Sequence, residues 1–183
     1  QFTQKLTGDD ASLSKQTEDG KKHFVGWELP GKTLGVIGLG AIGVKVANAA
    51  HDLGMKVLGF DPAITVANAW QLNANVEQAL SVDDIIARSD VLTVHVPLLE
   101  ATKNLVNLER LKLMKDSGVT ILNFAREGII NEQALLAGLE NGKIRAYICD
   151  FPTNAIYHHP KVIALPHLGA STNEAEENCK IMV

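Results

Sequence analysis

The stretch Thr33-Leu-Gly-Val-Ile-Gly38-Leu-Gly40-Ala-Ile-Gly43 decides the fold. Its first six residues form an apolar run that predicts a strand buried on both faces. Residues 41–53 follow with apolar side chains at helical spacing, so the Gly-x-Gly-x-x-Gly pattern stands between a strand and a helix. In that context the first glycine permits a tight turn, the second lets the backbone approach a pyrophosphate, and the third allows the helix to pack on the strand. The stretch therefore predicts a dinucleotide-binding turn, with the helix N-terminus facing the anion.

The second predicted strand, Met55–Phe60, ends at Asp61. A carboxylate at this place accepts hydrogen bonds from the ribose hydroxyls of the adenosine and would repel a 2′-phosphate. No arginine lies near Asp61 in sequence to accommodate that phosphate. The expected cofactor is therefore NAD rather than NADP. The alternative is a tight strand–helix turn with a surface aspartate.

Strands and helices alternate along the rest of the chain. Capping residues begin three of the helices, and a possible capping box, Ser171-Thr-Asn-Glu174, opens a last one. Continuous apolar strands that alternate with helices indicate a parallel sheet covered on both faces. We expect an α/β fold, a Rossmann-type doubly wound parallel sheet in three α/β/α layers. The further strands are predicted at Val91–Val96, Val119–Phe124, Ile144–Cys149 and Lys161–Ala164, and the further helices at Ser81–Ala87, Leu108–Met114 and Glu132–Glu140.

Composition narrows the class of protein. The 183 residues carry a net charge of −4, which argues against a nucleic-acid partner. No apolar run reaches the length of a membrane span. Cys149 and Cys179 form no Cys-x-x-Cys pair, and we interpret them as reduced thiols of a cytoplasmic protein.

The first thirty residues are weakly patterned and end at Pro30-Gly31. We expect an arm that is partly helical up to Lys22, and a flexible arm and a docked helix fit the pattern equally well. We interpret residues 1–30 as the remnant of an interdomain connection and residues 31–183 as the cofactor domain.

Three polar residues follow the ends of predicted strands: Arg126, Asp150 and His167. Open α/β sheets bind ligands at these carboxyl ends. Hydride transfer from a 2-hydroxy acid needs a cation for the carboxylate, which arginine binds bidentately. It also needs a base near neutrality for the hydroxyl proton, which histidine supplies. Taken singly, the arginine is more often a surface ion pair and the histidine a structural hydrogen-bonding group.

The motifs VIGLGAIG, HVPL, NFAREG and PHLGAST resemble the NAD-binding domain of the D-isomer-specific 2-hydroxyacid dehydrogenases. The resemblance runs from about Gly20 onward. GKKHFVGWELPGKTLG is similar to the branch that oxidises phosphoglycerate for serine biosynthesis, and YICDFP to the short bacterial members of that branch. Other 2-hydroxyacid oxidoreductases, such as hydroxypyruvate or glyoxylate reductases, remain alternatives, as does a non-catalytic corepressor module that senses NADH.

The resemblance implies a role for each matching position. Arg126 would bind the substrate carboxylate, His167 would be the general acid/base, and Asp150 would contact the nicotinamide carboxamide. His95, Val96 and Pro97 would line the adenine side. The full set of expected cofactor-binding residues is Gly38, Gly40, Ala41, Ile42, Gly43, Asp61, His95, Val96, Pro97, Thr102, Asn123, Ala125, Asp150 and Gly169. The resemblance also implies a small 2-hydroxy acid as substrate and a homo-oligomer, a dimer or tetramer.

Two departures from the family pattern concern the catalytic site. The family pairs its histidine with a glutamate, but no acidic residue occurs between Asp150 and His167, and Asn154 aligns best with the missing position. An amide orients an imidazole but does not stabilise its charged form as a carboxylate does. Glu127 stands where glycine is common.

The family's separate substrate domain is absent from this chain, so we expect this fragment alone to be inactive. We expect no metal, and we interpret His158-His159 as part of an exposed loop.

Overall fold

The computed structural model describes residues 2–169, 171–175 and 177 and contains one parallel sheet. The strands lie in the order β3-β2-β1-β4-β5-β6-β7. Because the chain moves outward from β1 to β3 and then returns beside β1 as β4, the direction reverses at the carboxyl ends of β1 and β4. The strands are β1 (Thr33–Ile37), β2 (Lys56–Phe60), β3 (Glu77–Gln78), β4 (Val91–Val94), β5 (Val119–Asn123), β6 (Ile144–Cys149) and β7 (Val162–Ala164).

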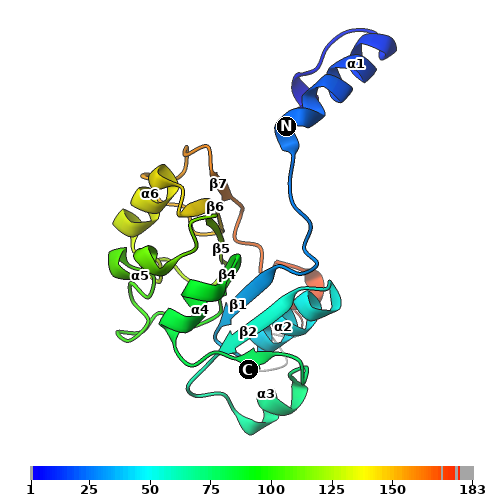
Figure 1. The fold of residues 1–183 in the computed structure, drawn as a ribbon. Coiled ribbons are helices and arrows are strands. Elements are labelled where there is room, and N and C mark those ends of the chain that lie inside the picture. Colours follow the sequence, from blue (N-terminus) through cyan, green and yellow to red (C-terminus); the bar gives the residue numbers. More distant parts are fainter. Residues whose placement is uncertain (1, 170, 176, 178–183) are drawn as a thin grey trace.

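Helices cover both faces of the sheet (Figure 1). On one face α2 packs through Val44, Ala47 and Ala50, and α3 lies against α2. On the other face α4, α5 and α6 form a row and bury apolar side chains such as Ile85, Leu111 and Leu139. This arrangement confirms the predicted doubly wound, three-layer fold. The helices are α2 (Ala41–Asp52), α3 (Val66–Gln71), α4 (Val82–Arg88), α5 (Leu108–Leu113) and α6 (Glu132–Asn141).

The helix caps follow the sequence closely. The side chains of Ser81, Asn107 and Asn131 each accept a hydrogen bond from the backbone N–H three residues later, as expected for N-caps. Gly142 ends α6 in the left-handed conformation, with a φ of 83°. The predicted cap at Ser171 was wrong by one residue, because the Thr172 hydroxyl accepts the N–H of Ala175.

Two elements were not expected from the sequence, and several predicted ends were too long. The short helix α3 and the two-residue strand β3 both lie between β2 and α4. Strand β4 ends at Val94 rather than Val96, and the N–H of His95 still donates to Ile37 O in β1 at 2.7 Å. The end of β4 matters for the site, because it frees residues 95–98 to line a cleft.

The N-terminal arm is helical and stands away from the sheet (Figure 1). It contains η1 (Thr3–Lys5), α1 (Asp10–Gly20) and η2 (Lys21–Phe24). The rings of Phe2 and Phe24 pack edge to face at 5.2 Å, which closes the arm on itself. Trp27 attaches the following segment to the domain, since its ring lies 5.8 Å from Lys32 Nζ and 5.9 Å from Arg145 Cζ.

No helix within the described part of the chain is both long and apolar enough to span a bilayer.

Candidate active site

The glycine turn joins β1 to α2, and its three glycines have different surroundings. Gly38 has a φ of 94°, and a Cβ there would lie 2.5 Å from the carbonyl oxygen of His95. A Cβ on Gly43 would collide with the carbonyl of Gly38. A Cβ on Gly40, in contrast, would meet no atom within 4 Å. The first and third glycines are therefore required by packing, whereas the second faces open space at the exposed N-terminus of α2, where Ala41 begins the helix.

Asp61 ties the end of β2 to this turn. One carboxylate oxygen accepts the N–H of Leu39 at 2.8 Å, and the other accepts the N–H of Ala63 at 2.8 Å. Each oxygen retains a further lone pair for a ribose hydroxyl. The carboxylate borders a depression of about 360 Å³ whose apolar lining was not anticipated from the sequence: Leu39, Ile64, Leu72, Val76 and Leu80. Leu39 belongs to the glycine turn, and the other four come from the region around α3 and β3, which carries no sequence motif.

A central cleft lies over the carboxyl ends of β4 to β7. It consists of two depressions of about 520 and 530 Å³ that share Ile42, His95 and Phe124. Arg126 lines the first and His167 the second. The structure therefore brings together side chains that are far apart in sequence. The cleft is also lined by Val96, Pro97, Leu98, Ala125, Asp150, Leu165, Pro166, Leu168 and Gly169.

Asp150 lines this cleft and carries an unsatisfied acceptor. Its Oδ1 atom is buried and has no hydrogen-bond partner among the described residues. A buried carboxylate oxygen without a donor is costly, so the position favours a ligand that brings an N–H group. The carboxamide of a nicotinamide is such a ligand. Together with the open space at Gly40 and the carboxylate of Asp61, this orphaned oxygen fits a bound NAD.

Arg126 and His167 are both exposed. Each of them contacts the ring of Phe151. The guanidinium Cζ lies 5.9 Å from the centroid of the Phe151 ring, and the imidazole centroid lies 4.5 Å from it. Arg126 also donates from Nη1 to its neighbour's carbonyl, Ala125 O, at 2.7 Å. The sequence predicts the arginine and the histidine as site residues, but it gives no signal for the aromatic ring that contacts both.

Asn123 supports the arginine loop rather than facing the cleft. Its buried amide donates to the carbonyl of Arg126 at 2.9 Å and to the hydroxyl of Tyr147 at 3.1 Å, and its oxygen accepts the N–H of Ala125. Burial raises the pKa of Tyr147, so this hydroxyl stays protonated. The network fixes the backbone on either side of Ala125.

Thr102 has a similar supporting place in the loop after β4. Its hydroxyl donates to the carbonyl of Pro97 at 2.5 Å and accepts the N–H of Leu99 at 2.8 Å. It thereby holds the segment that contributes Pro97 to the cleft.

His95 lies at the junction of the two depressions. Burial lowers its pKa below the ordinary value of 6.5, so the neutral imidazole is favoured. Its Nε2 lies 3.0 Å from the hydroxyl of Thr93. His95 therefore lines the cleft with an imidazole that favours the neutral form and that the Thr93 hydroxyl orients.

No hydrogen bond joins Asn154 to His167 in the described part of the chain. Asn154 is exposed and lines neither depression, and within the described ranges its side chain makes no hydrogen bond. The neighbouring Thr153 donates to Glu132 Oε2 at 2.5 Å and so holds this loop against the start of α6. Phe151 contacts the imidazole of His167.

The paired histidines 158 and 159 have local partners. The ring of His158 packs on Tyr157 at 4.8 Å, and His159 Nδ1 accepts the N–H of Lys161. Over residues 2–169, 171–175 and 177, no group of three or more His, Cys, Asp or Glu side chains is placed to hold a metal. Cys149 is buried with a free thiol, and Cys179 lies outside the described residues.

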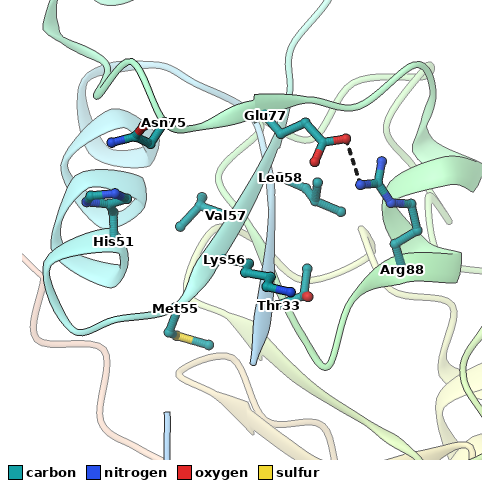
Figure 2. A pocket seen from close by; sticks show the side chains of 9 residues that line it. All are labelled: Thr33, His51, Met55, Lys56, Val57, Leu58, Asn75, Glu77 and Arg88. Atoms are coloured by element: carbon teal, nitrogen blue, oxygen red, sulfur yellow. Dashed lines mark hydrogen bonds and ion pairs between the residues drawn. The ribbon is translucent and has the colours of Figure 1, made fainter. Parts of the chain in front are cut away.

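A further depression lies at the opposite, amino end of the sheet (Figure 2). Its lining includes Lys56 and an ion pair between Arg88 and Glu77 at 2.6 Å. These side chains are remote from the glycine turn, and they provide control positions for experiments on the cleft.

Comparison with known proteins agrees with this geometry. Residues 1–169 match the model of the D-isomer specific 2-hydroxyacid dehydrogenase family, NAD binding domain. The chain belongs to this family. It is 42% identical over 175 residues to a D-3-phosphoglycerate dehydrogenase of Bacillus subtilis, and the match covers 92% of this chain but 33% of that protein.

Solved structures of the same class share the fold. The apo form of D-mandelate dehydrogenase from Rhodotorula graminis superposes with a TM-score of 0.80 at 27% identity, over 98% of this chain and 54% of that one. The D-lactate dehydrogenase of Aquifex aeolicus, complexed with NAD and lactic acid, gives 0.74 at 28% identity, over 92% and 60%. The chain spans about one third to three fifths of the length of these relatives. As the matching family model is that of the NAD binding domain, the cofactor is NAD.

Proposed function

We propose that this chain is the NAD-binding domain of a D-3-phosphoglycerate dehydrogenase, which oxidises 3-phosphoglycerate to 3-phosphohydroxypyruvate in serine biosynthesis. The observation that carries the proposal is the cleft that Arg126, His167 and Asp150 line together. The 42% identity to an enzyme of that name supports the choice of substrate. Alternative substrates are other D-2-hydroxy acids, because the structural relatives include mandelate and lactate dehydrogenases.

The chemistry divides between two side chains. The exposed N–H edge of the Arg126 guanidinium binds the substrate carboxylate and polarises the adjacent hydroxyl. An imidazole nitrogen of His167 accepts the hydroxyl proton as the carbon–oxygen double bond forms. Bound NAD supplies the hydride acceptor. In the reverse direction His167 returns the proton to the oxygen.

The test is steady-state turnover by the complete enzyme that we propose contains this chain. With NAD and 3-phosphoglycerate we expect turnover, and we expect His167→Ala to lower kcat by about 100-fold or more. Arg126→Ala should raise KM as well as lower kcat, since it removes the carboxylate contact. Lys56→Ala, at the far end of the sheet, should change neither. Tight NADH binding without turnover of any 2-hydroxy acid would overturn the proposal and favour an NADH-sensing corepressor-like module.

The isolated chain provides a second test. Arg126 and His167 are exposed at an open cleft, so water is not excluded from the reacting groups. We propose that residues 1–183 bind NAD but turn over 3-phosphoglycerate at least about 100-fold more slowly than the complete enzyme. Comparable rates would refute this.

A further inference from the structure

Phe151 lies between the two side chains to which the proposed function assigns the chemistry. The guanidinium of Arg126 lies over its ring, with Cζ 5.9 Å from the centroid. The imidazole of His167 packs on the same ring, with the centroids 4.5 Å apart and the planes inclined by 54°. One aromatic side chain therefore contacts groups from the loop after β5 and from the segment after β7.

The backbone holds this ring from both sides. Cys149 ends β6 in the buried core, and Asp150 occupies the cleft with its orphaned oxygen. Two residues after Phe151, Thr153 is bonded to Glu132 at the start of α6. Phe151 itself is half-buried, so its ring has a limited choice of positions.

Both contacts leave the chemical edges of the polar groups available. The Arg126 guanidinium donates from Nη1 to Ala125 O, and its other N–H groups remain available to a carboxylate. An imidazole that packs by its ring keeps its nitrogens free, and within the described ranges no hydrogen bond engages those of His167. A phenyl ring cannot accept the imidazole proton, so it orients His167 through packing alone.

We propose that Phe151 is a positioning residue that sets the relative placement of Arg126 and His167. In this chain, which has no acidic residue between Asp150 and His167, the ring orients the imidazole by packing. The proposal rests on the proposed function for its catalytic consequence, but the packing itself is measurable without turnover.

The first experiment uses NMR of the whole chain with isotope-labelled histidine. The ring current of Phe151 displaces the His167 ring-proton resonances, and Phe151→Leu should move them toward unstructured positions, whereas Phe151→Tyr should retain the displacement. Tyr157→Leu is the matched control, because Tyr157 packs on His158 at a similar distance of 4.8 Å. It should move the resonances of His158 and leave those of His167 in place.

The second experiment measures kinetics in the complete enzyme. Phe151→Leu should lower kcat by about tenfold or more with a smaller change in the Kd for NADH, because misorientation affects the reacting groups rather than cofactor affinity. Phe151→Tyr should restore most of the rate. Phe151→Met, an unbranched apolar side chain without a ring, replaces the leucine variant if that variant fails to fold.

The outcomes separate this proposal from the proposed function. Unmoved His167 resonances in folded Phe151→Leu, or a kcat equal to that of the wild type, would overturn the positioning role. A wild-type enzyme that turns over no 2-hydroxy acid would overturn the proposed function instead, and the NMR result would still decide whether the ring packs on His167.

Discussion

At the scale of single residues, the open space beside Gly40 yields the sharpest prediction. Gly40→Val should leave the fold intact, since its Cβ meets no protein atom within 4 Å. The added side chain would occupy the approach of the pyrophosphate, so we expect NAD binding to weaken by about tenfold or more, about 1.4 kcal/mol. Calorimetric titration measures the Kd, and thermal unfolding checks the fold.

Gly26→Val is the matched control, because a Cβ at Gly26 also meets nothing within 4 Å but lies in the arm. It should alter neither quantity. An unchanged Kd in Gly40→Val would contradict the assignment of this turn to the cofactor.

His95 predicts a pH dependence of stability. Burial lowers its pKa below 6.5, so the unfolded chain binds the proton more tightly than the folded one. The contribution of neutral His95 is fully present above that value and is lost as the pH falls toward the folded pKa. His95→Gln should therefore reduce the loss of unfolding free energy between about pH 7.5 and pH 5.5, measured by urea titration. An identical loss in the variant would show that burial of His95 carries no such penalty.

The sequence predicted individual site residues unevenly. Arg126 and His167 could be identified because polar side chains after buried strands collect at one edge of a parallel sheet. Phe151 could not, because its role depends on how its ring packs against two distant segments. Asn154 was favoured by alignment alone, and its pairing with His167 stays a prediction.

At the scale of elements, Asp90 joins three segments at the amino end of the sheet. Its carboxylate accepts the N–H of Thr33 and the ammonium of Lys115, both at 2.8 Å. Burial opposes ionisation, but these two bonds outweigh it and hold the pKa of Asp90 below its usual value. The resulting stability is present above about pH 4 and is lost as the pH falls through the lower, folded pKa.

Asp90→Asn should therefore lower the unfolding free energy near neutrality by about 1–2 kcal/mol and flatten its decline in acid. Denaturant titrations over a range of pH measure both effects. Glu109→Gln removes the exposed partner of Lys112 and serves as the comparison, with an expected change of at most about 0.5 kcal/mol. Equal changes in the two variants would contradict the account of Asp90.

Long, strongly patterned elements were predictable, and short ones were not. The predicted caps at Ser81, Asn107 and Asn131 were correct because each side chain bonds a backbone group close by in sequence. The two residues of β3 exist because Leu58 and Gly59 of β2 offer a free edge, which is a tertiary effect. The apolar lining of the depression beside Asp61 could not be predicted either, because it forms only when distant segments pack together.

At the scale of the whole molecule, the order of the strands brings the glycine turn beside the residues that line the cleft. The reversal between β1 and β4 places the glycine turn next to the loops that follow β4, β5, β6 and β7. The alternation of predicted strands and helices indicated the doubly wound parallel sheet, whereas the order of its strands is known only from the structure. The packing of the arm could not be predicted from the sequence. It depends on a contact between Phe2 and Phe24 and on the contacts of Trp27, not on a repeating pattern of apolar residues.

The most direct test of the central claim is a paired titration of this chain with NADH and NADPH, followed by fluorescence. If the carboxyl edge of the sheet holds the dinucleotide and Asp61 faces its ribose, NADH should bind at least about tenfold more tightly than NADPH, and Asp61→Ser should narrow that ratio. Equal affinities, or a preference for NADPH, in the wild-type chain would contradict the account.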